Sequence, residues 1–69
     1  MGGIKGFWRH TENGGIYAIE STPFGRVLGA IGPLDPENLQ DLGEYDYTEK
    51  INIWVEQAFI DNKLRRFNP

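Results

Sequence analysis

The chain has 69 residues, including four phenylalanines, three tyrosines and two tryptophans, and its formal net charge is −3. This length allows one domain with a small core. The lack of cysteine excludes disulfide bonds, and a single histidine excludes a His-rich metal site. The acidic balance disfavours general nucleic-acid binding, which needs clustered lysine and arginine. We therefore expect one small soluble domain, 1–69, stabilised by packing or by association with a partner.

Three segments rich in β-forming residues predict strands, and turn residues separate them. The first strand spans 4–10, and an Asn-Gly pair at 13–14 then supplies the positive φ angles of a tight hairpin turn. The second strand spans 16–21 and is followed by a Thr-Pro-Phe-Gly turn at 22–25. The third strand spans 26–31. Because both turns are short, the strands are expected to form an antiparallel meander.

The turn positions also predict which side chains share a face of this sheet. With 13–14 and 23–24 at the turn centres, Trp8 pairs with Ile19, and Ile19 with Leu28. The face expected to pack on the core is apolar and carries Trp8, Tyr17, Ile19, Leu28 and Ala30. The opposite face is mixed and carries Lys5, Phe7, Arg9, Ile16, Ala18, Glu20, Val27 and Ile31.

A long connection follows the third strand. Asp35 and Pro36 favour a short helical turn near 36–42, with Asp35 as its N-cap, and Gly43 would end it. Six residues between 35 and 49 are acidic and none is basic. Tyr45 and Tyr47 lie in this acidic stretch and are secondary candidates for contact with a partner.

The clearest pattern is an amphipathic helix from about 49 to 64, capped by Thr48 or Asp46. Its core face, at about 100° per residue, holds Ile51, Trp54, Val55, Ala58 and Phe59. Lys63, Arg65 and Arg66 would complement the helix dipole at its end. The expected fold class is α+β: a three-stranded antiparallel β-meander, a long connection and one C-terminal helix, in βββα order.

A second apolar stripe lies on the opposite side of this helix and comprises Ile53, Ile60 and Leu64. A helix that packs on one sheet needs one apolar face, so something is expected to cover the second. One possible cover is the connection, through Leu34, Leu39 and Leu42. The other is a partner protein or a second copy of the chain.

No residue pattern predicts catalysis or metal binding. His10 is expected to pair with Tyr17 and to lie away from the hydroxyl of Ser21. Asp35, Glu37 and Asp41 lack the spacing of a calcium loop. We expect no cofactor, no metal, no membrane span and no signal-peptide core. A cytoplasmic location agrees with the lack of cysteine.

Three functional hypotheses follow, and the first is a non-catalytic protein-interaction module (an accessory subunit, adaptor or regulator). It would bind another protein, or form a homodimer, through the C-terminal helix; the contact residues are Ile53, Ile60, Leu64, Arg65, Arg66 and Phe67. The second is single-stranded nucleic-acid binding on the mixed sheet face by Lys5, Phe7 and Arg9. The third is a small-ligand-binding protein or enzyme that uses His10, Tyr17 and the carboxylates of 35–41.

Overall fold

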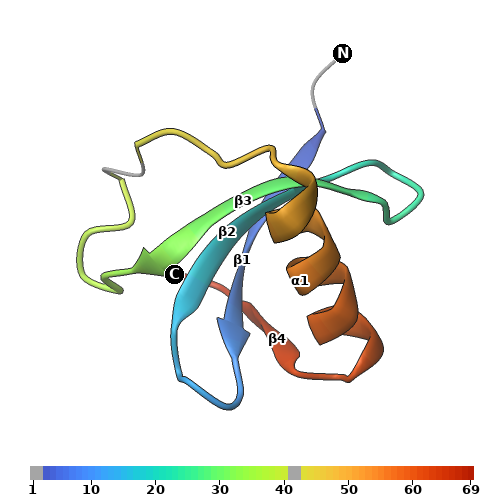
Figure 1. The fold of residues 1–69 in the computed structure, drawn as a ribbon. Helices are drawn as coiled ribbons and strands as arrows, with labels where there is room; N and C mark the ends of the chain where they lie inside the picture. The colour runs from blue at the N-terminus through green and yellow to red at the C-terminus, as the bar shows by residue number, and fades with distance from the viewer. Residues whose placement is uncertain (1–2, 41–42) are drawn as a thin grey trace.

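Strands β1 (Ile4–His10), β2 (Ile16–Ser21) and β3 (Val27–Leu34) form the antiparallel meander that the sequence predicts. A fourth strand, β4 (Leu64–Phe67), follows helix α1 (Glu49–Ile60) and pairs with β1. The sheet order is β3-β2-β1-β4, and α1 lies against one face (Figure 1). This computed structural model describes residues 3–40 and 43–69. The α+β class is confirmed, and the predicted βββα order lacked the fourth strand.

The hairpin of β1 and β2 closes two residues away from the predicted register. The His10 N–H donates to the Gly15 carbonyl at 2.8 Å and the Gly14 N–H to the His10 carbonyl at 2.9 Å, so the loop spans 11–14. Gly14 has a φ of 71°, a left-handed conformation that glycine adopts readily. Trp8 consequently pairs with Tyr17 and not with Ile19. A shift of two residues leaves every side chain on its predicted face.

The pairing of β2 with β3 contains a bulge that the sequence analysis missed. Ser21 pairs with Val27 and Glu20 with Gly29, so Leu28 is an extra residue in β3. Val27 is buried in the core cluster, while Leu28 is half-buried outside it. The predicted positions of these two residues were therefore wrong. The bulge exchanges them because one extra residue reverses the alternation of side chains along a strand.

The core lies between the sheet and α1. Its half-buried margin includes Trp8, whose ring meets the edge of Phe59 with the centroids 4.9 Å apart. Trp54, predicted as core, is 38% exposed at this margin and stacks on His10. The buried cluster consists of Tyr17, Ile19, Val27, Ala30, Val55, Ala58 and Leu64.

Helix α1 ends at Ile60, before the predicted end at Leu64. Asn62 adopts a left-handed φ of 60°. The Lys63 N–H donates to the Ala58 carbonyl at 2.8 Å and the Asn62 N–H to the Phe59 carbonyl at 3.1 Å. These two bonds form a Schellman motif, which ends the helix and reverses the chain. Leu64 thereby returns to the sheet as the first residue of β4.

The connection from β3 to α1 follows the edge of β3. Asp46 and Ala30 form a bridge in which each N–H donates to the other's carbonyl, at 2.8 and 3.0 Å. Thr48 then caps α1 by accepting a hydrogen bond from the Ile51 N–H, as predicted. Residues 36–40 form turns and no α-helix, and the rest of the predicted helical turn, 41–42, lies outside the described residues.

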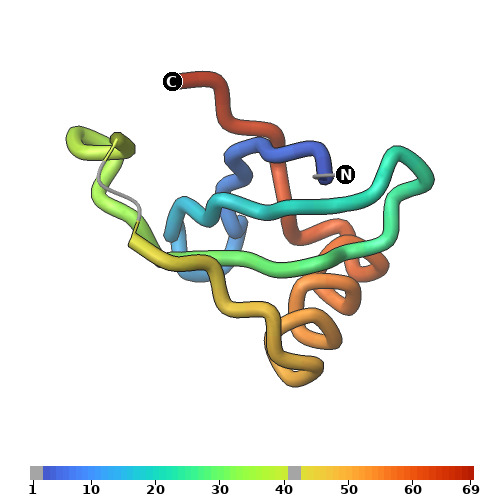
Figure 2. The backbone as a smooth tube through the Cα atoms, turned by 90° about the horizontal axis from the view of Figure 1, so that it is seen from above, coloured from blue at the N-terminus to red at the C-terminus, as the bar shows by residue number. Residues whose placement is uncertain are grey.

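The first part of the connection lies far from the helix (Figure 2). Leu39 lines a hollow with Phe7 and Pro69, on the side of the sheet away from α1. Leu34 belongs to β3 and pairs with Ile16. The predicted intramolecular cover for the second stripe of the helix is therefore wrong for these two leucines, and Leu42 lies outside the described residues.

Candidate functional site

The outward face of α1 carries two large apolar side chains. Ile53 is 60% exposed and Ile60 is 75% exposed. They are seven positions apart, about two helical turns, and therefore lie on the same side of the helix. Phe24, at the tip of the turn between β2 and β3, is 98% exposed. Phe24 and Ile60 line one hollow of about 550 Å³, together with Arg26 and Glu56. We call Phe24, Ile53 and Ile60 the outer surface.

The predicted partner-binding residues do not form one site. Leu64 is only 5% exposed and belongs to the core, so it is not part of the helical stripe. Arg65, Arg66 and Phe67 lie on β4, not at the end of the helix. The predicted role of Arg65 and Arg66 as charges that complement the helix dipole is therefore wrong.

Strand β4 instead brings these residues beside the residues predicted for nucleic-acid binding. Arg65 pairs with Arg9, and Phe67 with Phe7. Side chains directly opposite each other in a sheet share a face, so all four lie on the face away from α1. Neither β1 nor β4 contains an acidic residue. Arg66 pairs with Trp8, which packs on Phe59 of α1, so it starts from the opposite face of these strands. We call Lys5, Phe7, Arg9, Arg65, Arg66 and Phe67, from both faces of β1 and β4, the β1–β4 surface.

Three cations of the β1–β4 surface lie over aromatic rings, and the fourth, Arg65, donates to the carbonyl and the side-chain oxygen of Asn62. The guanidinium of Arg9 is 5.2 Å from the ring centroid of Phe67, and that of Arg66 is 5.3 Å from Trp8. The ammonium of Lys5 is 5.0 Å from the ring of Tyr45, which comes from the connection. Such distances allow cation–π attraction. Each ring therefore helps to hold a cation while the charge stays exposed to solvent.

A hollow of about 350 Å³ opens at one end of the β1–β4 surface. A side chain at Gly6 would collide with the guanidinium of Arg66, so this glycine leaves room for the cation. The described residues that line the hollow include three aromatic rings and two cations and no acidic residue: Lys5, Gly6, Phe7, Tyr45, Arg66, Phe67, Asn68 and Pro69. We call it the ring-lined hollow.

Glu20 anchors the connection beside this hollow. Its carboxylate accepts hydrogen bonds from the Gly3 N–H at 3.0 Å and from the Tyr47 hydroxyl at 2.9 Å. These bonds, led by the one from Gly3, lower the pKa of Glu20, and the bond to Glu20 raises the pKa of the Tyr47 hydroxyl. The ring of Tyr47 stacks on Tyr45 with centroids 6.2 Å apart. Burial, followed by the charge of Glu20, raises the pKa of Tyr45. Glu20 thus positions the ring that faces Lys5.

His10 lies in a separate polar hollow of about 400 Å³ between the first hairpin and the end of α1. The imidazole is 7% exposed and stacks on Trp54 with ring centroids 5.3 Å apart. Its Nδ1 accepts from the Glu12 N–H at 3.2 Å, so a neutral ring carries its proton on Nε2. Ser21 pairs with Ile4, at the other end of the sheet. The structure therefore does not bring His10 and Ser21 together.

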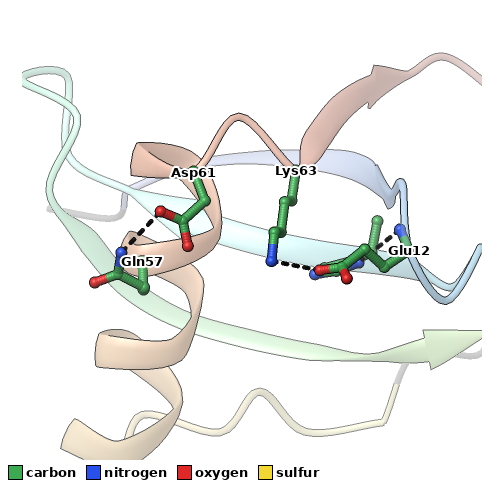
Figure 3. Close-up of polar contacts among 5 residues, drawn as sticks. Glu12, Gln57, Asp61 and Lys63 are labelled. Atoms are coloured by element: carbon green, nitrogen blue, oxygen red, sulfur yellow. Dashed lines mark hydrogen bonds and ion pairs between the residues drawn. The ribbon is translucent and has the colours of Figure 1, made fainter.

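An ion pair in the wall of this hollow links the first hairpin to the segment that follows the helix (Figure 3). Lys63 forms an ion pair with Glu12 at 2.5 Å, and Gln57 donates to Asp61 at 3.0 Å. The hydrogen bond and the charge of the pair lower the pKa of Glu12 and raise that of Lys63. These polar side chains are thus engaged with one another, which is typical of a structural contact.

The carboxylates of the connection are spread along it. The Asp35 side chain accepts from the Glu37 N–H at 2.9 Å, and Asp41 lies outside the described residues. Within 3–40 and 43–69, no group of three histidine or acidic side chains is placed to hold a metal ion. No helix in the same residues has the length and apolar character that a membrane span requires.

Sequence reasoning missed Phe24 and β4, and it named Tyr45 as a secondary partner-binding candidate without placing it beside Lys5. For β4 a signal existed, since an asparagine just after the last apolar residue of a helix favours its termination. Comparisons of the chain with models of protein families, with curated proteins and with solved structures find no match. Any proposed function must therefore come from the two surfaces and the hollows described above.

Proposed function

We propose that this domain is a non-catalytic interaction module that binds another protein through the outer surface. The observation that supports this is the exposure of Phe24 and Ile60, which flank one hollow at 98% and 75% exposure. Large apolar side chains grouped on a small surface are typical of contact sites. Burying one such side chain contributes about 1.5–3 kcal/mol, so three of them can anchor a partner.

The charge on the exposed face of α1 favours a different protein over a second copy paired through its own α1. Glu56 lies midway between Ile53 and Ile60 on the exposed face of α1. A twofold packing of two α1 helices centred on these isoleucines would bring the two Glu56 carboxylates together. Like charges in such a contact are repulsive. A partner that presents apolar side chains and a cation for Glu56 avoids this repulsion.

The test is to isolate the full chain with its bound proteins from its native cells, as wild type and as Ile60→Asp. We expect one protein to co-purify in stoichiometric amounts with the wild type and at least about tenfold less with Ile60→Asp, because a buried carboxylate is strongly disfavoured. The matched control is Ile4→Asp, since Ile4 is also exposed, at 55%, but lies at the start of β1.

The fold of each variant is checked by urea unfolding, because the proposal requires Ile60 to be a surface residue. We expect Ile60→Asp to change the unfolding midpoint no more than Ile4→Asp does. Equal recovery of the partner with wild type and Ile60→Asp would contradict the proposal. So would unfolding of Ile60→Asp, because the side chain would then belong to the core.

A further inference from the structure

The ring-lined hollow combines the two chemical features of a nucleotide site, on a surface independent of the outer surface. Phe7, Tyr45 and Phe67 supply aromatic faces, and Lys5 and Arg66 supply positive charge. We propose that this hollow binds one nucleotide of a single-stranded nucleic acid. The base stacks on Phe7 and Phe67, and Lys5 and Arg66 contact its phosphate.

The size and the walls of the hollow suit a planar ligand. Its volume of about 350 Å³ lies within the range of small-molecule sites. The three rings that line it come from β1, the connection and β4. Proteins bind unpaired bases by stacking them on aromatic side chains of an open sheet. Phe7 and Phe67, paired on the face away from α1, provide such neighbouring rings.

The charges beyond the hollow favour a strand over a free nucleotide. The exposed cations Arg9 and Arg65 pair with each other on the same two strands, next to Phe7 and Phe67. Lys5 lies on the same face and completes a row of three cations, while Arg66 starts from the other face and contributes to the hollow only. A strand can set successive phosphates along this row, whereas a free nucleotide reaches only the hollow.

The acidic groups nearby set the strength of binding. Glu20 stands opposite Lys5, and its carboxylate is already engaged by Gly3 and Tyr47. With a net charge of −3, the whole chain repels phosphate at long range. Binding is therefore modest, and it weakens with salt in proportion to the few phosphates that are neutralised.

The experiment is a fluorescence titration of a labelled short oligouridylate, and separately of short oligothymidylate, with the full chain. We expect binding at about 50 mM salt and clearly weaker binding at about 200 mM salt. The other arms are free uridine monophosphate and a polyglutamate peptide of equal charge. We expect both to bind at least about tenfold more weakly than the oligonucleotides, because neither combines a base with successive phosphates.

Two pairs of variants connect the binding to the hollow. Phe67→Leu keeps an apolar side chain but removes a ring, and should weaken oligonucleotide binding about fivefold or more. Phe24→Leu removes an exposed ring elsewhere and should change nothing. Lys5→Gln should weaken binding and reduce the dependence on salt. Lys50→Gln removes an exposed cation of α1 and should not.

Four results would overturn the proposal. They are no oligonucleotide binding at low salt, equal binding of polyglutamate, equal binding of the free nucleotide, or no effect of Phe67→Leu and Lys5→Gln. Urea unfolding identifies a variant that fails to fold. If Phe67→Leu does, the comparison of Lys5→Gln with Lys50→Gln decides alone.

Discussion

Two side chains decide local features that neither apolar periodicity nor strand propensity indicates. Glu20 lies on the mixed sheet face as expected, and there it accepts hydrogen bonds from Gly3 and from Tyr47 of the distant connection. Asn62 takes the left-handed conformation that ends α1. Glu20 and Tyr47 are 27 positions apart, so local sequence cannot predict their hydrogen bond. The conformation of Asn62 is local, and the helix-stop preference of asparagine indicates it.

The Glu20 contact predicts a change in the pH dependence of stability. Because the pKa of Glu20 is lowered in the folded chain, its contribution is present above the pKa of an unfolded glutamate, about 4.3, and is lost as the pH falls through the folded pKa. Glu12 and Asp46 also have lowered pKa values, so they too contribute to the loss of stability at acidic pH.

We therefore expect Glu20→Gln to lose less stability than the wild type between about pH 7 and about pH 3. Urea unfolding midpoints at the two pH values measure this difference. Glu56→Gln, an exposed change on α1, serves as the control and should keep the wild-type difference. An unchanged difference in Glu20→Gln would show that the carboxylate is not held as described.

The left-handed conformation of Asn62 predicts that alanine destabilises the fold at this position and that glycine does not. Asn62→Ala should lower the free energy of unfolding by about 1 kcal/mol, because alanine tolerates a left-handed φ poorly. Asn62→Gly should stay within about 0.5 kcal/mol of the wild type, since glycine is favoured at this helix position. Chemical denaturation measures both. If alanine proved no worse than glycine, the helix would not end in this conformation.

At the level of elements, the sequence predicted the three-strand meander and the buried face of α1 well. In the first hairpin each side chain lies on its predicted face although the register was wrong by two residues, because an even shift preserves the alternation of side chains. The bulge at Leu28 could not be predicted, since it depends on how β3 pairs with β2. The fourth strand was missed because Leu64 continues the apolar period of the helix, while its burial depends on the chain reversal at Asn62.

The two sides of α1 predict contrasting effects on stability. Val55 is fully buried against the sheet, at 0% exposure, so Val55→Ala should lower the free energy of unfolding by about 2 kcal/mol. Ile53 is exposed, so Ile53→Ala should change it by no more than about 0.5 kcal/mol. Urea unfolding of the two variants gives this comparison. Comparable losses would mean that both sides of the helix are covered within the chain.

At the scale of the whole molecule, the predicted partner site separates into two surfaces. Ile53 and Ile60 stay on the helix and gain Phe24 as a neighbour of Ile60. Arg65, Arg66 and Phe67 move to β4 and join Lys5, Phe7 and Arg9, which the sequence analysis assigned to a different hypothesis. Sequence alone could not group these residues, because 56 positions separate Arg9 from its partner Arg65.

The two surfaces are chemically distinct, and so are their proposed ligands. The outer surface is apolar and is proposed to bind a protein, whereas the β1–β4 surface is basic and aromatic and is proposed to bind a nucleic-acid strand. The two surfaces share no residue, so separate variants test the two proposals independently. Ile60→Asp should leave oligonucleotide binding unchanged, and Lys5→Gln should leave the bound protein in place.

Photo-crosslinking from position 24 in native cells tests most directly whether another protein binds the outer surface. Replacing Phe24 by benzoylphenylalanine is conservative, because this aromatic side chain is 98% exposed. We expect a covalent adduct with one other protein, absent when Ile60→Asp is added and absent when the crosslinker replaces Ile4. No adduct from position 24, or the same adduct from position 4, would contradict it.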